Sequence, residues 1–233
     1  MTQSITTELR ELAERAGTEL AEASATDVLR WTVANFGADF VVASNMQDGV
    51  LIDIATQVKA DVDVLFLQTG YHFAETLGTR DAIQQAYPDI TIINAEADRT
   101  VAEQDAEHGP RLHDRDPNLC CHLRKVLPLR HTLANYSCWV TGVRRADAPT
   151  RADTPMVTWD ERNGLVKVNP LAAWTNDEFD NYIAAYGILQ TPLVSEGYLS
   201  IGCAPCTRKV AAGEDPRSGR WAGSNKTECG LHG

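Results

Sequence analysis

Residues 39–67 read DFVVASNMQDGVLIDIATQVKADVDVLFL and place two strand candidates around one helix candidate. Residues 39–44 and 62–67 are short, apolar and rich in β-branched side chains, which is typical of buried strands. A polar loop at 45–49 and a helical stretch at 50–58 separate them. A strand, a helix and a second strand in this order favour a parallel pair joined by a helical crossover.

The same alternation continues on both sides of this stretch. We expect one or two helices within 4–36, helices at 73–87, 117–127 and 175–186, strands at 90–93 and 139–142, and a hairpin of 156–159 with 165–168. The prediction is an α/β fold with a mostly parallel sheet flanked by helices, followed from residue 189 by a loop-rich tail. Ligands of such sheets bind outside the carboxyl ends of the strands, where Ser44, Gln68-Thr69-Gly70 and residues 142–145 fall.

Length and composition favour one globular domain with a functional tail. The chain has 233 residues, of which 43% are hydrophobic and 23% are charged. Its first residues lack the basic and apolar layout of a secretory signal, and no apolar run is long enough to span a bilayer. We therefore expect a cytoplasmic protein that makes no membrane contact and keeps its thiols reduced.

The charge is unevenly distributed along the chain. The net charge is −11, which argues against nonspecific binding to nucleic acid. Residues 111–151 nevertheless carry eight Lys and Arg against three Asp and Glu, and residues 203–233 carry five against three. These two stretches also hold all six cysteines. Basic charge gathered around cysteines in an otherwise acidic chain favours a local site for a small anion. Chance clustering of basic residues on solvated loops is the alternative.

Four of the cysteines form two close pairs. Cys120 and Cys121 are adjacent, and Cys203 and Cys206 form a Cys-Ala-Pro-Cys motif. Adjacent helical residues point about 100° apart, so two neighbours rarely serve one small tetrahedral ion without strain, whereas a bulkier cluster accepts both. The pattern therefore favours a [4Fe–4S] cluster on these four residues, and a structural zinc site is the main alternative.

Cys229 stands apart from that quartet, close to the carboxyl end, and is the candidate nucleophile. Lys226 and His232 flank it, and positive charge lowers the pKa of a thiol. Gly230 allows the tail a tight turn. An incidental thiol at a frayed terminus is the alternative. Cys138 opens a predicted strand and is interpreted as a small buried apolar residue.

Several basic side chains lie near these cysteines. Lys125 follows Cys121 by four residues and so lies on the same face of the predicted helix. Arginines recur beside Gly or Pro turns, and a guanidinium group suits phosphate or sulfate oxygens. These arginines are Arg144, Arg145, Arg151, Arg217 and Arg220. Ser44 and the backbone amides after the first strand offer a weaker anion site without a lysine-bearing phosphate loop.

With these motifs in view, the chain resembles the assimilatory sulfonucleotide reductases, and within them the iron–sulfur adenylylsulfate (APS) reductases, from about Ser44 to the end. The resemblance rests on CCHLRKVLPL at 120–129, TGVRR at 141–145, GCAPCT at 202–207 and ECGLH at 228–232. It implies an adenine-nucleotide α-hydrolase-like fold, APS as substrate with AMP and sulfite as products, a [4Fe–4S] cluster, thioredoxin or a glutaredoxin-like reductant, and a role in sulfate assimilation and cysteine biosynthesis.

The resemblance also assigns residues. Cys229 would attack the sulfate sulfur with His232 beside it, and the cluster ligands would be the two cysteine pairs. The substrate-binding residues would be Ser44, Lys125, Gly142, Arg144, Arg151, Arg217 and Arg220. Residues 1–200 would form the sulfonucleotide-binding and cluster domain, and residues 201–233 a cluster-ligand loop and catalytic tail that is not an independent domain.

The chain departs from the family at two loops, and other functions stay open. The loop after the first strand lacks the serine- and glycine-rich form of the family, so Ser44 is the only residue carried over there. The family usually has Leu-Asp-Thr-Gly after the second strand, whereas this chain has Leu67-Gln68-Thr69-Gly70 and so one carboxylate fewer. The alternatives are a reductase for 3′-phosphoadenylylsulfate (PAPS), a nucleotide-activating sulfur transferase and a non-enzymatic zinc module. The presence of both cysteine pairs favours APS over PAPS. A homo-oligomer is compatible with the sequence.

Overall fold

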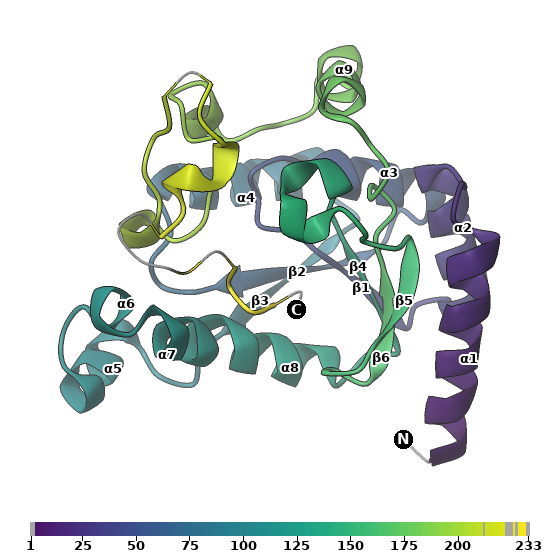
Figure 1. Cartoon of the computed structure of the whole chain (residues 1–233), viewed down its shortest axis with the longest axis horizontal. Helices are drawn as coiled ribbons and strands as arrows, with labels where there is room; N and C mark the ends of the chain where they lie inside the picture. Colours follow the sequence, from purple (N-terminus) through teal and green to yellow (C-terminus); the bar gives the residue numbers. More distant parts are fainter. Residues whose placement is uncertain (1–2, 212, 222–225, 227, 232–233) are drawn as a thin grey trace.

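The computed structural model describes residues 3–211, 213–221, 226 and 228–231, and it is built around one six-stranded sheet. The strands are β1 (Phe40–Ala43), β2 (Asp63–Gln68), β3 (Thr91–Glu96), β4 (Cys138–Thr141), β5 (Val157–Asp160) and β6 (Leu165–Val168). Their order across the sheet is β3-β2-β1-β4-β6-β5, with every pair parallel except β5 and β6 (Figure 1). The predicted α/β class and the predicted hairpin are therefore confirmed.

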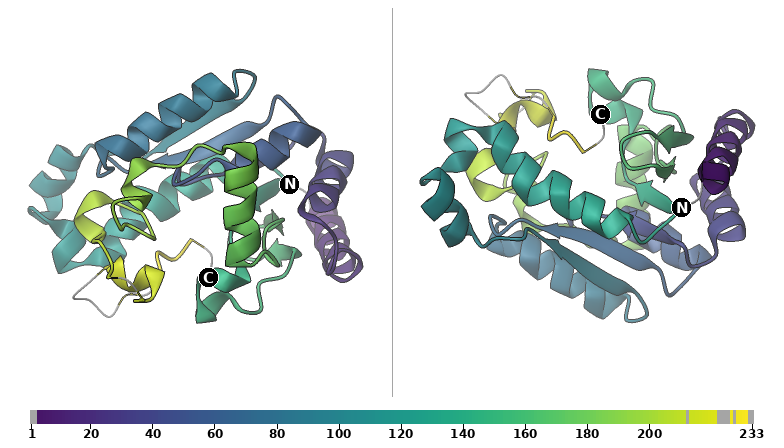
Figure 2. Two further views of the ribbon diagram at one scale, coloured as in Figure 1. Left: turned by 90° about the horizontal axis from the view of Figure 1, so that it is seen from above. Right: turned by 90° about the horizontal axis from the view of Figure 1, so that it is seen from below.

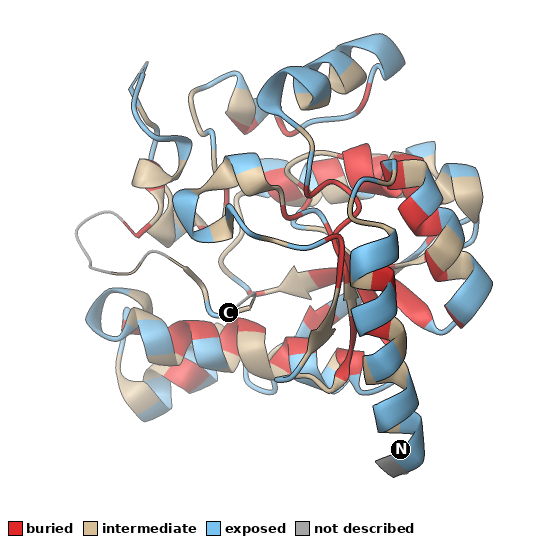
Figure 3. Ribbon diagram, turned by 45° about the vertical axis from the view of Figure 1, so that its right-hand side comes forward, coloured by how far each residue is buried: buried red, intermediate tan, exposed pale blue. Residues whose placement is uncertain are grey.

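Helices cover both faces of this sheet, as expected from its buried, apolar strands. The helices are α1 (Gln3–Glu19), α2 (Ala25–Phe36), α3 (Val50–Val58), α4 (Ala74–Ala86), α5 (Val101–His108), α6 (Leu112–Arg115), α7 (Pro117–Cys121), α8 (Leu127–Leu133) and α9 (Asn176–Tyr186). The side chains of successive residues in a strand point to opposite faces of the sheet. Val42, Val64 and Val140 join a large core with α1 to α4, whereas Val41 and Trp139 join a smaller core with α8 (Figures 2 and 3).

The helix that carries the cysteine pair is longer than predicted. It begins with Pro117 after the cap Asp116, whose carboxylate accepts the Leu119 amide at 2.9 Å. It then passes through a π-helical turn at His122–Val126 and continues as α8 to Leu133. The turn closes with the Leu127 amide on the His122 carbonyl. Such turns widen the helix locally and are frequent at functional sites.

Several boundaries differ from the expectations. No element was predicted for 101–115, where α5 and α6 form; both are short and polar, so they lack a strong apolar period. β3 runs to Glu96 rather than 93, and β4 starts at Cys138 and leaves Gly142 outside the strand. The carboxyl-terminal segment is loop-rich as predicted, with short 3₁₀ turns at Pro192–Val194, Ala204–Cys206 and Pro216–Gly219.

None of the helices in the described part of the chain combines the length and the apolar character needed to cross a membrane.

Candidate active site and cluster pocket

Three loops meet at the carboxyl edge of the sheet, because β2, β1 and β4 are neighbours. Ser44 follows β1, and its hydroxyl accepts the Met46 amide at 3.1 Å within its own turn. Gln68 ends β2, and its side-chain oxygen accepts the Gly70 amide at 3.2 Å. Gly142 follows β4 and is exposed. The predicted convergence of these loops is confirmed, and the Gln68 side chain serves the turn itself.

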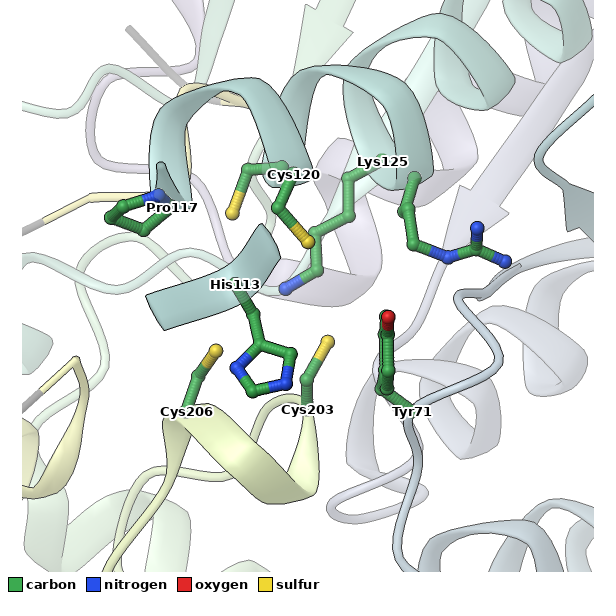
Figure 4. A pocket seen from close by; sticks show the side chains of 9 residues that line it. Tyr71, His113, Pro117, Cys120, Lys125, Cys203 and Cys206 are labelled. Carbon is green, nitrogen blue, oxygen red and sulfur yellow. The ribbon is translucent and has the colours of Figure 1, made fainter. Parts of the chain in front are cut away.

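The two cysteine pairs line one pocket, although some eighty residues separate them in the sequence. Cys120 and Cys121 approach from α7, and Cys203 and Cys206 from the 3₁₀ turn at Ala204–Cys206. Figure 4 shows Cys120 facing Cys203 and Cys206 across a shared space. Backbone contact holds the second pair in place, because the Ala204 amide donates to the Tyr71 carbonyl at 2.7 Å.

Three of the four cysteines that line the pocket resist ionisation. All four thiols are free, and burial together with neighbouring thiols raises the pKa of Cys120 to about 12 and of Cys206 to about 11. Thiols gathered in this way, facing Lys125, are a donor set that is costly to ionise without a positively charged partner. Within the described residues, no three His, Cys, Asp or Glu side chains come close enough together to hold one metal ion. Zinc would need thiolates at about 2.3 Å from one centre.

Lys125 connects this pocket to the tail cysteine. It is buried on the π-helical turn and lines the same pocket as the four cysteines (Figure 4). Burial lowers its pKa, but Cys203 and Cys229 raise it, and the net shift is upward. The ammonium group of Lys125 therefore stays charged at neutral pH.

Arg220 is the second cation whose pKa is influenced by Cys229. Its guanidinium packs over the Trp221 ring, 4.5 Å from the ring centroid, and against the backbone of Gly202. Burial lowers the pKa of Arg220, and the electrostatic effect of Cys229 opposes this shift. Its Nε is buried without a hydrogen-bond partner. In the part of the chain that the structure describes, no carboxylate forms an ion pair with Arg220 or Lys125.

The other three arginines predicted to bind substrate already face carboxylates. Arg144 pairs with Asp147 at 2.9 Å and packs over the Phe179 ring of α9 at 4.3 Å. Arg151 pairs with Asp147 at 3.4 Å and with the tail carboxylate of Glu228 at 3.2 Å, and Arg217 pairs with Glu228 at 2.9 Å. Lys125 and Arg220 are therefore better placed than these three to meet an added anion.

The tail enters this site between α7 and the turns that follow β4 (Figure 1). Cys229 is half-buried and lines an open groove together with Asn118, Arg130 and Arg162. Lys226, expected to act on the thiol of Cys229, donates to Asn118 at 2.6 Å. His232 lies outside the described residues. Cys138 is fully buried in the sheet, away from the pocket lining, as predicted.

The sequence analysis did not identify Arg124, which connects the π-helical turn to the loop after β2. Arg124 is buried, and its guanidinium donates to the carbonyls of Thr69 and Arg99, the latter at 3.1 Å. It fixes the loop after β2 against the π-helical turn, while Cys203 Sγ lies 3.4 Å from Thr69 Oγ1. The signal was present, because Arg124 follows Cys120 by one helical turn. Tyr71 and His113, which also line the pocket, carried no comparable pattern.

The sequence profile of the phosphoadenosine phosphosulfate reductase domain matches residues 39–209, most of the chain. The chain belongs to this family. Among curated members, adenosine 5′-phosphosulfate reductase of Mycolicibacterium smegmatis is 61% identical, covering 100% of this chain and 98% of its own. The same enzyme of Streptomyces coelicolor is 55% identical over 98% and 96%. The resemblance to sulfonucleotide reductases is therefore confirmed.

Solved structures agree with membership of the phosphoadenosine phosphosulfate reductase family. Phosphoadenylyl-sulfate reductase of Candida auris, in a phosphate complex, superposes with a TM-score of 0.72 at 25% identity, covering 90% of this chain and 98% of that one. FMN adenylyltransferase of Candida glabrata superposes with a TM-score of 0.56 at 11% identity, covering 87% and 74%. The second likeness concerns the fold alone and agrees with the predicted α/β architecture.

Proposed function

We propose that this chain reduces adenosine 5′-phosphosulfate to sulfite and AMP in sulfate assimilation, as the names of its relatives suggest. The position of Cys229 carries the proposal. The thiol lies close enough to Lys125 and Arg220 to influence the pKa of both cations. A nucleophile that acts on the pKa of two cations, neither of which has a carboxylate partner among the described residues, fits a substrate with sulfate and phosphate oxygens.

In the first step, the Cys229 thiolate attacks the sulfur of the substrate. A sulfur–sulfur bond forms, the bond between sulfur and the bridging oxygen breaks, and its electron pair leaves with the phosphate of AMP. Cys229 then carries a thiosulfonate group. Lys125 and Arg220 would stabilise the charge that builds on the sulfonyl and bridging oxygens, which is usually a large term in catalysis. Ser44 and Gly142, at neighbouring strand ends, would contact the nucleotide, and His232 would assist Cys229.

The second step requires two electrons from a protein dithiol, for which thioredoxin or a glutaredoxin-like protein is the proposed partner. One thiolate of the dithiol attacks the Cys229 sulfur and displaces sulfite, which leaves a mixed disulfide. The second thiol then releases Cys229 as a thiol and closes the disulfide of the partner. This chemistry needs free thiols, and all six cysteines of the chain are free. It would therefore take place in a reducing compartment such as the cytoplasm.

Cys120, Cys121, Cys203 and Cys206 would hold a [4Fe–4S] cluster in this proposal. When bound, the cluster would supply a compact charged group that fixes the two cysteine segments relative to Lys125. The reaction above takes its electrons from the dithiol. Lys125, whose pKa is raised by both Cys203 and Cys229, would be the cation that the cluster and the nucleophile share.

The test is Cys229→Ser in anaerobically purified protein. Wild-type protein incubated with the substrate and no reductant should gain one SO₃ group on the tryptic peptide that follows Lys226, and the variant should gain none and release no sulfite. Paired kinetics with APS and PAPS would show which nucleotide is preferred. A wild-type peptide that stays unmodified, or sulfite release by the serine variant, would remove the basis of the proposal.

A further inference from the structure

We propose that Glu228 is the positioning residue that clamps the tail and sets the place of Cys229; this deepens the proposed function and rests on it. The Glu228 carboxylate accepts hydrogen bonds from Arg151 through both Nε and Nη2, at 3.3 and 3.2 Å. Arg217 Nη2 approaches the same carboxylate at 2.9 Å, and the Thr150 hydroxyl donates to it at 3.4 Å. Bidentate contacts between arginine and a carboxylate fix the relative orientation of the two groups as well as their distance.

The burial of this contact separates it from an ordinary surface ion pair. The side chains of Arg151 and Arg217 are only 15% and 14% exposed, and that of Glu228 is 31% exposed. Exposed pairs contribute little because water and salt screen them, whereas covered pairs are screened less. A further carboxylate holds Arg151 in place, because Asp147 forms ion pairs with Arg151 at 3.4 Å and with Arg144 at 2.9 Å. This chain of charges leads from the end of β4 to the tail.

The tail is held on the other side of Cys229 as well. Arg162 Nη1 donates to the Gly230 carbonyl at 3.3 Å. Leu231 packs against the smaller core cluster, which includes Val41, Leu65 and Trp139. Gly230 has a φ of +79°, a left-handed turn that favours glycine. Because both neighbours of Cys229 are anchored, the position of its sulfur is set by contacts that the sulfur itself does not make.

The two steps of the proposed reaction make opposite demands on this clamp. Attack on the substrate needs the sulfur fixed in line with the leaving oxygen, since small misplacements are costly. Reduction needs a second protein to reach the same sulfur, which is half-buried here. Loss of the Glu228 charge should therefore slow the first step, while the second should not slow.

A second reading of the same contact gives a different result. If Arg151 and Arg217 bind the substrate anion directly, Glu228 would be a placeholder that the substrate must displace. Removing its charge would then strengthen binding of the nucleotide and leave attack unimpaired. Both guanidinium groups are largely buried and Arg151 is also paired with Asp147, which favours the clamp. The affinity for AMP distinguishes the two interpretations.

The experiment compares Glu228→Gln with Glu228→Asp and with the control Glu196→Gln, which removes a carboxylate from a surface pair with Lys209 at 3.3 Å. Without substrate, iodoacetamide labelling of the peptide 227–233 should be about tenfold faster in Glu228→Gln than in wild type. With substrate and no reductant, thiosulfonate formation in a single turnover should be about 10- to 100-fold slower, and AMP binding should change less than about twofold. Glu228→Asp, which keeps the charge, should recover part of both rates.

Labelling at the wild-type rate in Glu228→Gln, or tighter AMP binding with unimpaired thiosulfonate formation, would overturn the clamp. Glu196→Gln should match wild type in every measurement, and the same changes in it would show that they do not depend on this site. Failure of the wild-type protein to form any thiosulfonate would instead count against the proposed function, while the labelling rates would still decide the clamp.

Discussion

The guanidinium of Arg220 packs directly on the backbone of Gly202, the residue before the first cysteine of the Cys-Ala-Pro-Cys motif. A Cβ at position 202 would lie 2.7 Å from Arg220 Cζ and 3.1 Å from its Nε. Real Cβ atoms essentially never come within 3.0 Å of another heavy atom, so any side chain at this position must displace the arginine. The glycine therefore links the loop that carries Cys203 and Cys206 to Arg220.

Gly202→Ala should impair catalysis by moving Arg220. Removal of one well-placed donor for transition-state charge typically costs about 10²–10³ in rate, so a partial displacement should lower kcat/KM by about tenfold or more. Because Cys203 is the next residue, iron content should be measured on the same sample. An alanine variant with wild-type iron content and wild-type kcat/KM would show that Arg220 does not act on the substrate.

Two helical glycines should respond to alanine with opposite signs. Gly17 lies on α1, where a Cβ would stand 2.8 Å from the Val157 carbonyl oxygen of β5, whereas nothing lies within 4 Å of a Cβ at Gly78 on α4. Alanine in an open helical site should raise the free energy of unfolding by about 0.5–1 kcal/mol. At Gly17 the clash should outweigh this gain and lower stability by about 1–3 kcal/mol. Urea unfolding of both variants checks the signs, and stabilisation by Gly17→Ala would contradict the packing of α1 on β5.

Apolar patterning made most of the sheet predictable. The strands around Val41, Val64 and Val140 are short, mostly apolar runs, and their alternation with helices along the chain indicated a parallel sheet. The neighbours β1 and β4 could not be paired from sequence, because the register depends on packing across a crossover of nearly a hundred residues. α5 formed with little apolar periodicity, and its sequence signal was the capping box of Thr100 and Glu103, which an apolar pattern does not reveal.

The candidate site was predictable in its residue types and not in its pairing. Spacing alone separated the four paired cysteines from Cys229. The ion-pair partners of the basic side chains could not be predicted, because Glu228 was recognisable in the sequence only as a neighbour of Cys229. Its contact with Arg151 joins residues 77 positions apart, which no local pattern reveals. Charge balance within the site therefore needed the structure.

Removal of one cysteine from either pair should abolish metal binding. Cys120→Ser and Cys203→Ser should each lose most of the iron and acid-labile sulfide of anaerobically purified protein, together with its visible absorption, because each removes a ligand from a four-thiolate set. Cys138→Ser is the control: it should keep the iron while a buried hydroxyl lowers stability by about 1–3 kcal/mol. Stoichiometric zinc without sulfide in the wild-type protein would favour the structural zinc site instead.

Asp48 should make the stability of the protein depend on pH between about 4 and 6. Burial raises the pKa of its carboxyl from 3.8 to about 6, against the opposing effects of the Val50 amide and Arg144. The folded state then binds this proton more tightly than the unfolded state. Its stabilising contribution is complete below about pH 4 and is lost as the pH rises through 6. At 1.36 kcal/mol per unit of pKa, the change is about 1–3 kcal/mol.

Asp48→Asn isolates this contribution, because the amide oxygen still accepts the Val50 amide hydrogen bond, which measures 3.1 Å in the wild-type protein, and does not titrate. Urea unfolding at several pH values should show wild type losing stability relative to the variant as the pH rises from 4 to 6. Asp27→Asn is the opposite control: the Ser24 hydroxyl and Arg30 lower the pKa of Asp27, so wild type should there gain stability relative to its variant as the pH rises. Parallel curves for wild type and Asp48→Asn would mean that the Asp48 carboxyl is solvated and that the loop after β1 is more open than the structure has it.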